Sequence, residues 1–152
     1  MYRKILVPID GSPTAQRGFE EALGLARVMG ATLLLVNVMD PYPVSVEWAS
    51  ASTWQLIADG MRQHGRSLID RARSTAIDVG VAAETKLMES SAGRVADALI
   101  ELVREAGCDL IVMGTHGRRG FNHLVMGSDA ERVVRESPVP VLLVRHPDTQ
   151  PG

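Results

Sequence analysis

The residues best suited to chemistry lie in a glycine- and arginine-rich segment that runs from Gly114 to Ser128. Three of its first seven residues are glycine and two are arginine, in the order Gly114-Thr115-His116-Gly117-Arg118-Arg119-Gly120. Glycines let backbone amides approach an anion closely, and paired arginines can hold phosphate oxygens. The segment then leads through Gly127 into a helical pattern, whose N-terminus favours negative charge. This arrangement predicts a phosphate-binding loop.

The loop matches neither of two common phosphate-binding motifs. No Gly-Lys-Ser/Thr sequence follows the glycines, so it is not a Walker loop. It follows the fourth predicted strand and contains no G-x-G-x-x-G, so it is not a dinucleotide fingerprint either. Ser128 also has a structural interpretation, because Ser128-Asp129-Ala130-Glu131 fits a capping box with serine at the N-cap. That interpretation explains the serine but not the long loop before it.

A second candidate is Asp10-Gly11-Ser12, which follows the first predicted strand. A carboxylate at this place can accept hydrogen bonds from ribose hydroxyls or from an adenine amino group. The alternative is a tight turn formed by Asp10 and Gly11, with Ser12 capping the next helix. Taken alone, the turn is the more common use of these residues, and both interpretations stay open.

The elements that must position these residues alternate along the chain. Five short runs rich in β-branched and aliphatic residues are typical of buried parallel strands: Lys4–Ile9, Thr32–Val38, Ala82–Met88, Leu110–Met113 and Val139–Val144. Helical patterns separate them, from Ser12 to Gly30, from Trp54 to Asp78, from Ser91 to Gly107 and from Ser128 to the residue before Ser137. The alternation predicts an α/β fold, a doubly wound parallel sheet with helices on both faces. Ligands of such sheets bind beyond the carboxyl ends of the strands.

Composition limits the classes of function. The 152 residues suit one domain, which we expect over residues 1–146, followed by a flexible tail at 147–152. The formal net charge of −2 and the two residues each of Trp, Tyr and Phe argue against nucleic acid as a partner. The single cysteine, Cys108, and the lack of any long apolar run predict a cytoplasmic protein with no membrane association. The spacing of His64, His123 and His146 indicates no metal site.

These residues resemble a known family. The spacing Gly114-x2-Gly117-x9-Gly127-Ser128 is similar to the ATP-binding signature of the universal stress proteins. The run Ile5-Leu6-Val7-Pro8-Ile9-Asp10-Gly11-Ser12 resembles the first strand and turn of that family. Residues 109–114 and 137–144 resemble its last two strands. The match covers nearly the whole chain and is weakest over Asp40–Val79.

The resemblance implies an adenine-nucleotide-hydrolase-like single domain with five parallel strands in the order 3-2-1-4-5. It also implies ATP as the ligand, with Mg²⁺ or Mn²⁺ as a possible companion. Pro8, Ile9 and Asp10 would flank the adenosine, with Asp10 on the ribose, and Val38 and Met113 would contact adenine. The residues implied at the phosphates are Gly114, His116, Gly117, Arg118, Gly127, Ser128, Asp129 and Ala130.

Asp129 departs from the family pattern, which more often has a small or apolar residue at this position. A carboxylate beside phosphates weakens their binding unless Arg118, Arg119 or a metal ion screens it. We therefore expect a nucleotide-binding stress-response regulator with at most slow ATP hydrolysis, since no general base is positioned by the sequence. Two alternatives stay open. One is an adenylating-type enzyme, which the absence of a Ser-Gly-Gly loop after the first strand disfavours. The other is an interaction module with a vestigial nucleotide site, which Asp129 favours.

The last strand bears on assembly. Val139–Val144 is apolar throughout, and the implied strand order places it at the edge of the sheet. Pro140 has no amide hydrogen, so it fits an edge or an interrupted ladder. We expect a homodimer in which this strand meets its own copy antiparallel, as in the resembling family. The alternative is a monomer whose prolines block aggregation.

Overall fold

The computed structural model describes residues 1–40, 49–91, 94–116 and 126–146. The loop glycine Gly117, Arg118 and the expected tail at 147–152 lie outside the described residues. Strands and helices alternate along the described chain, in the order β1 (Lys4–Pro8), α1 (Pro13–Met29), β2 (Thr32–Met39), α2 (Ala51–Asp78), β3 (Ala83–Glu89), α3 (Val95–Ala106), β4 (Leu110–Gly114), α4 (Ser128–Glu136) and β5 (Val141–Val144).

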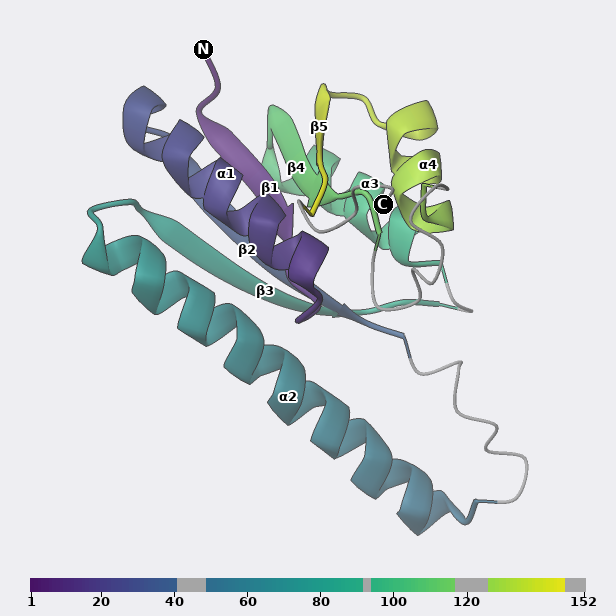
Figure 1. The fold of residues 1–152 in the computed structure, drawn as a ribbon. Helices are drawn as coiled ribbons and strands as arrows, with labels where there is room; N and C mark the ends of the chain where they lie inside the picture. The colour runs from purple at the N-terminus through teal and green to yellow at the C-terminus, as the bar shows by residue number, and fades with distance from the viewer. Residues whose placement is uncertain (41–48, 92–93, 117–125, 147–152) are drawn as a thin grey trace, which may run out of the picture.

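The strands form one five-stranded parallel sheet in the order β3-β2-β1-β4-β5 (Figure 1). The strand order reverses at β1, because the chain builds β2 and β3 on one side of it and then crosses to β4 and β5 on the other. The predicted fold class and strand order are therefore confirmed. None of the helices in the described residues is long and apolar enough to cross a membrane.

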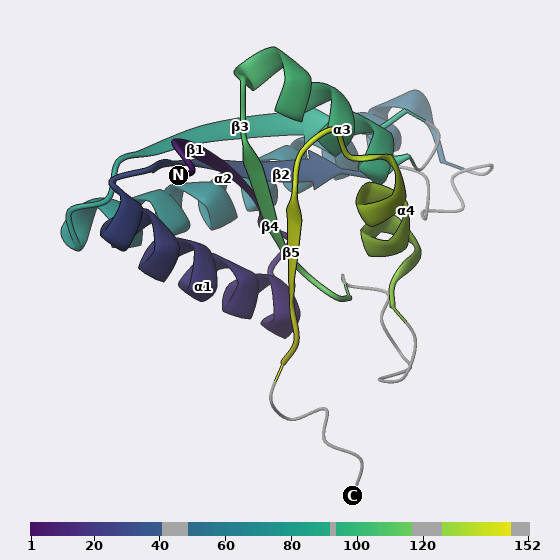
Figure 2. The same cartoon turned by 90° about the horizontal axis from the view of Figure 1, so that it is seen from above.

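Helices cover both faces of the sheet, as Figure 2 shows from above. Successive side chains of a strand point to opposite faces, which is why both faces need a cover. Ile5 and Val7 of β1 pack in one core cluster with residues of α1 and α2. Leu6, between them, packs in the other cluster with residues of α3 and α4. All three side chains are fully buried, which explains the continuous apolar run in the sequence.

Helix α1 begins as the sequence predicts. The hydroxyl of Ser12 accepts the backbone N–H of Ala15 at 3.2 Å, and Pro13 occupies the first turn, where its missing N–H costs nothing. The helix ends at Gly30, which has a φ of 68° and donates its N–H to the carbonyl of Ala26. These local signals place α1 beside β1 with its N-terminus at the carboxyl edge of the sheet.

Three boundaries differ from the predictions by two residues or more. Helix α2 begins at Ala51 rather than Trp54, because the Ser50 hydroxyl caps it by accepting the N–H of Thr53. Helix α3 begins at Val95 rather than near Ser91, and its N-cap, Arg94, makes no side-chain cap. Strand β5 begins at Val141 rather than Val139, because the hydroxyl of Ser137 holds both backbone groups of Val139 in a turn.

Pro8 determines where β1 and β4 separate. These strands pair only at Ile5–Leu110 and Leu6–Ile111. The backbone of Lys4 faces β4, since its carbonyl accepts the N–H of Asp109, and strand alternation gives Pro8 the same orientation. Proline has no N–H to donate, so the ladder cannot continue at this residue. The two strands therefore part at their carboxyl ends, where ligands of this fold class bind.

Candidate functional site

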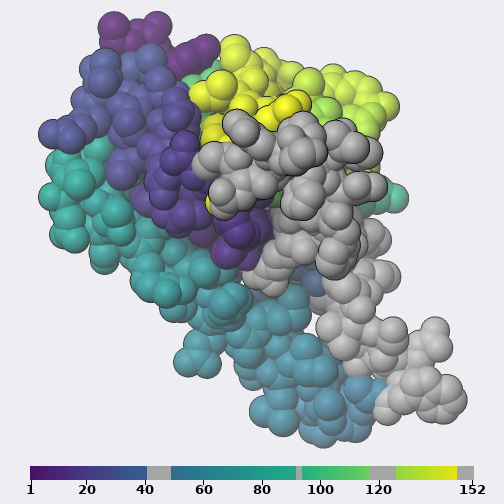
Figure 3. Space-filling model, in the orientation of Figure 1, coloured from purple at the N-terminus to yellow at the C-terminus, as the bar shows by residue number. Residues whose placement is uncertain are grey.

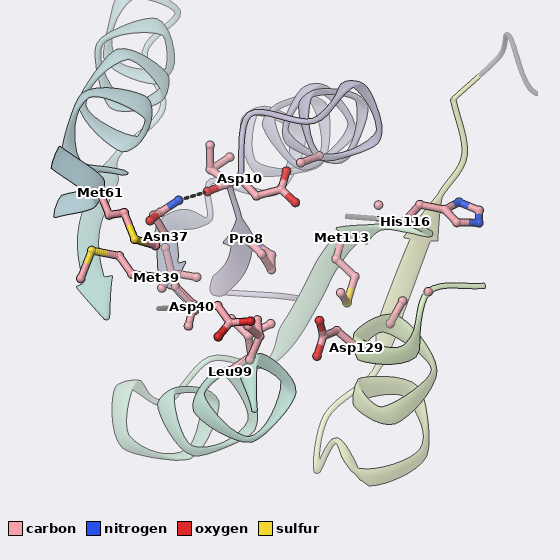
Figure 4. Close-up of a pocket in the computed structure, with 18 of the residues that line it drawn as sticks. Pro8, Asp10, Asn37, Met39, Asp40, Met61, Leu99, Met113, His116 and Asp129 are labelled. Atoms are coloured by element: carbon pink, nitrogen blue, oxygen red, sulfur yellow. Dashed lines mark hydrogen bonds between the residues drawn. The ribbon is translucent and has the colours of Figure 1, made fainter. Parts of the chain in front are cut away.

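A pocket of about 650 Å³ opens at the carboxyl edge of the sheet, where β1 and β4 separate (Figure 4). Its volume lies within the range of about 300–1,000 Å³ that small-molecule sites occupy. The ends of β1, β2 and β4 and the N-terminus of α4 contribute most of its lining. Helix α2, whose first half extends past the end of β3 (Figures 1 and 3), closes one side.

The structure brings most of the predicted site residues to this one pocket. Those that line it are Pro8, Ile9, Asp10, Val38, Met113, Gly114, His116, Gly127, Ser128, Asp129 and Ala130. His116 is the least central of them. In Figure 4 its ring lies at the rim and is turned away from Asp10 and Met113. Its Nδ1 lies 3.0 Å from the Thr115 hydroxyl, and its carbonyl accepts the hydroxyl of Thr14.

Asp10 serves in a turn and lines the pocket at once. Its Oδ1 accepts the backbone N–H of Ser12 at 2.8 Å, and Gly11 has a φ of 83°, which a residue with a side chain rarely adopts. The hydrogen bond orients the carboxylate at the mouth of the β1–α1 turn. The two interpretations that the sequence left open are therefore compatible, because the turn itself presents the carboxylate to the pocket.

Gly114 has a packing reason as well as a place in the pocket. A Cβ at this position would lie 2.7 Å from the carbonyl carbon of Thr14 and 2.8 Å from its Cβ. Gly18 lies one turn further along α1 and packs against the backbone of β4. A Cβ on Gly18 would lie 3.2 Å from the Gly114 nitrogen. Glycines on both elements let α1 approach the end of β4, so the glycine that opens the loop is required by the fold.

The two ends of the glycine-rich loop are joined at its base. The N–H of Gly127 donates to the carbonyl of Thr115 at 2.9 Å, and the N–H of Thr115 donates to Val144 of β5 at 3.0 Å. The Gly127 amide therefore already has an acceptor. The amides that follow it in α4 come before the first intrahelical hydrogen bond, so they have no acceptor within the helix. That bond runs from Glu131 N–H to the carbonyl of Gly127.

The predicted capping box at Ser128 is not formed. Gly127 is the N-cap of α4, Ser128 is the first helical residue, and no side chain caps the helix. The prediction placed the cap one residue too late, because the chain enters the helix at Gly127 with an extended backbone (φ −59°, ψ 149°). Ser128 consequently has no capping role, and it lines the pocket.

Asp129 links two helices. Its Oδ1 accepts the backbone N–H of Ala96, in the first turn of α3, at 3.3 Å. Helix α3 has no cap of its own, so the carboxylate from α4 takes that role across a distance of 33 residues in the sequence. The sequence carries no signal for this contact, since it depends on how α3 and α4 pack.

Sequence reasoning missed one wall of the pocket. Met39, Met61 and His64 all line the cavity, although the sequence assigned none of them to the site. Asn37 and Asp40 were not singled out at all, although both also line it. A polar Asn37 inside the otherwise apolar run Leu33–Val38 was the one signal that could have been used. The wall combines apolar contacts with a few polar groups, as small-molecule sites commonly do.

The carboxylates of the pocket do not form a metal centre by themselves. Asp10, Asp40 and Asp129 come from three different elements. Among the residues that the structure describes, no group of three or more His, Cys, Asp or Glu side chains is arranged to hold a metal ion. The described side chains alone therefore offer a divalent cation no complete set of ligands.

Comparison with known proteins assigns the chain to a family. The family model described as the universal stress protein family matches residues 1–145. The chain belongs to the universal stress protein family. A universal stress protein of Thermus aquaticus is 34% identical over 145 residues, which cover 95% of this chain and 100% of that protein.

Solved structures of universal stress proteins share the fold. One from Burkholderia pseudomallei is 36% identical, with a TM-score of 0.76, over 94% of this chain and 96% of its own. Another universal stress protein was solved in complex with cAMP. It is 26% identical with a TM-score of 0.69, over 94% of this chain and 97% of its own.

Proposed function

We propose that this universal stress protein is a regulatory protein of the cytoplasmic stress response that binds an adenine nucleotide in the pocket between β1 and β4. The observation that carries the proposal is the convergence of the predicted site residues on one cavity at the point where strand order reverses. A relative solved with cAMP supports an adenine nucleotide as the ligand. The sequence positions no general base beside the loop, so binding rather than turnover is the proposed activity.

The proposed orientation follows from the chemistry of the lining. Adenine would lie against Val38 and Met113, and the ribose hydroxyls would meet the carboxylate of Asp10. Phosphates would lie at the first turn of α4, where the amides of Ser128 and Ala130 precede the first intrahelical bond. Gly117 and Arg118 would complete the phosphate loop.

The number of phosphates is the finer part of the proposal. The Asp129 carboxylate lines the pocket at the phosphate end and repels each added negative charge. ATP would therefore bind with Mg²⁺ or Mn²⁺ held on its own phosphates, or with the loop arginines as screens. Without them, nucleotides with fewer phosphates are favoured.

Calorimetric titration of the purified chain with ATP, AMP and cAMP tests the proposal. Gly127→Val places a β-branched side chain at the loop base, and we expect it to weaken binding by more than about tenfold, which is about 1.4 kcal/mol. Gly24→Val is the matched control, because a Cβ at Gly24 contacts nothing within 4 Å. Wild-type protein that binds none of the three nucleotides would refute the function. Equal affinity in the Gly127 variant would refute the loop assignment.

We also propose a homodimer through β5. The strand is at the edge of the sheet, and Leu142 on it is 37% exposed. An apolar edge strand offers unpaired backbone groups to a second copy, and a twofold axis would pair the two strands antiparallel.

A further inference from the structure

The ladder between β1 and β2 ends in an unusual way beside the pocket. The register of the two strands stops at Pro8–Val36. The N–H of Ile9 still donates to the carbonyl of Val36 at 2.8 Å. In a continued parallel ladder, the next bond would run from the N–H of Val38 to the carbonyl of Ile9. That bond is absent from the backbone hydrogen bonds of the described residues.

A side chain takes the place of the missing donor. The Nδ2 of Asn37 donates to the Ile9 carbonyl at 2.8 Å, as the dashed line in Figure 4 shows. A carbonyl can only accept, so the amide nitrogen and not the amide oxygen must face it. Asn37 is 3% exposed, and a polar side chain so deeply buried needs a specific partner.

Helix α2 leaves room for this amide. A Cβ on Gly65 would lie 2.4 Å from the Oδ1 of Asn37 and 2.9 Å from the Cδ1 of Leu87. Any larger residue at position 65 would displace the amide from Ile9. Glycine lowers helix stability, so its use in the middle of α2 is explained by the space that Asn37 needs.

Because the Asn37 side chain takes the place of the Val38 N–H as donor to Ile9, the N–H and C=O of Val38 are left facing the pocket. In β2, Leu33 N–H and Met39 C=O bond to the β3 side, so by alternation the N–H and C=O of Val38 face the β1 side. Beyond Ile9, no strand of the described part of the chain occupies that side, and Val38 lines the cavity. One residue thus offers a donor and an acceptor side by side.

This pair matches adenine and not its 6-oxo analogue. Adenine presents N1 as an acceptor beside the N6 amino group as a donor, which complement the N–H and C=O of Val38. Hypoxanthine presents N1–H as a donor and O6 as an acceptor. Its donor would face the N–H of Val38 and its acceptor would face the C=O, so neither protein group would be paired. Sites built to hydrogen-bond a substrate discriminate strongly against a mismatched analogue.

We propose that Asn37 is a positioning residue that sets the selectivity of the pocket for adenine. Its side chain donates to the Ile9 carbonyl at the end of the β1–β2 ladder, and so prevents the Val38 N–H from bonding to that carbonyl. The proposal rests on the adenine-nucleotide function given above. It adds a residue that need not touch the base and that acts through the backbone of its neighbour.

Two variants test the proposal by different routes. Asn37→Leu removes the donor at similar size, and the Ile9 carbonyl can then recruit the Val38 N–H. Gly65→Ala keeps the asparagine but displaces its amide. We expect wild-type protein to prefer AMP over IMP by about tenfold or more, and both variants to reduce that ratio to about threefold or less. Gly24→Ala, remote from the pocket, is the control.

Amide exchange measured by NMR gives a second readout, which a merely structural role of Asn37 would not move. The Val38 amide should exchange quickly in the free wild-type protein, slow on addition of AMP, and be protected without ligand in Asn37→Leu. If wild-type protein binds AMP and both variants keep its AMP/IMP ratio, the inference is wrong and the function stands. If wild-type protein binds neither nucleotide, the function and the inference both fall. Should Asn37→Leu not fold, Gly65→Ala alone decides.

Discussion

At the scale of single residues, Asp129 has two opposed effects. Its carboxylate lines the pocket and would repel the phosphates of the proposed nucleotide. The same carboxylate accepts the N–H of Ala96 and stabilises the start of α3. A substitution that removes the side chain changes both effects together. Asparagine separates them, because its amide oxygen still accepts the Ala96 N–H while the charge is lost.

We expect Asp129→Asn to bind ATP more tightly than wild-type protein, with a smaller gain for AMP because AMP carries less charge. Asp129→Ala should also gain affinity for ATP, but should lose about 1 kcal/mol of stability with the helix cap. Calorimetry measures the affinities and thermal unfolding the stability. Weaker ATP binding by Asp129→Asn in the presence of Mg²⁺ would mean that the carboxylate holds the cation.

The one thiol of the chain is predicted to be unreactive. Burial raises the pKa of Cys108 to about 11, and the side chain is 5% exposed. The neutral thiol is favoured in the folded state, so its contribution to stability is complete below the unfolded pKa and is lost as pH rises from about 9 towards 11. A disulfide reagent at pH 8 should label Cys108 slowly in native protein and rapidly in denaturant. Fast labelling of the native protein would show that the chain around Cys108, just before β4, opens to solvent.

At the scale of elements, a close glycine contact joins α1 and β4 beside the pocket. Gly114 and Gly18 let the two backbones approach, and the hydroxyl of Thr14 then reaches the carbonyl of His116. Helix α1 therefore holds the start of the glycine-rich loop as well as the turn that carries Asp10. The packing of one pair of elements positions two parts of the site.

Gly114→Ala should destabilise the fold by about 1–3 kcal/mol, because the added methyl group meets the Thr14 backbone, which cannot move independently of α1. Chemical denaturation measures the loss. Gly24→Ala, on the exposed side of α1, should leave stability unchanged or slightly raised. Equal stability of Gly114→Ala and wild-type protein would show that the α1–β4 contact is looser than the structure describes.

At the scale of the whole molecule, the sheet has two edges of different character. Strand β3 at one edge carries exposed charged residues such as Glu84, which oppose pairing with another chain. Strand β5 at the other edge is apolar, with Val141 and Leu143 packed against the α3–α4 face. The difference directs the proposed dimer to β5.

Leu142→Glu should shift the proposed dimer towards monomer, because a twofold axis brings two copies of the new charge into one interface. We expect the dimer dissociation constant to rise by about tenfold or more. Light scattering at several concentrations measures it. Leu56→Glu, at an exposed apolar position of α2, is the control. A wild-type monomer at micromolar concentration, or a variant dimer of unchanged strength, would exclude this interface.

Local chemistry explains what the sequence alone determined about this protein. The alternation of elements, the two-faced burial of the strands and the Ser12 cap all depend on residues a few positions apart. The glycine-rich loop and the Asp10 turn could also be located, because each directly follows a strand and the carboxyl ends of parallel strands lie at one edge.

Only the tertiary structure decided the contacts that shape the site. Asn37 meets Ile9 across 28 positions, Asp129 meets Ala96 across 33, and Thr14 meets His116 across 102. No periodicity or turn rule links such residues, since each contact depends on the packing of separate elements. The Ser128 cap was misplaced for a related reason, because the exact entry of α4 is determined by the Thr115–Gly127 bond at the base of the loop. The sequence thus located most of the residues that line the pocket, and long-range packing determined how their atoms are arranged in it.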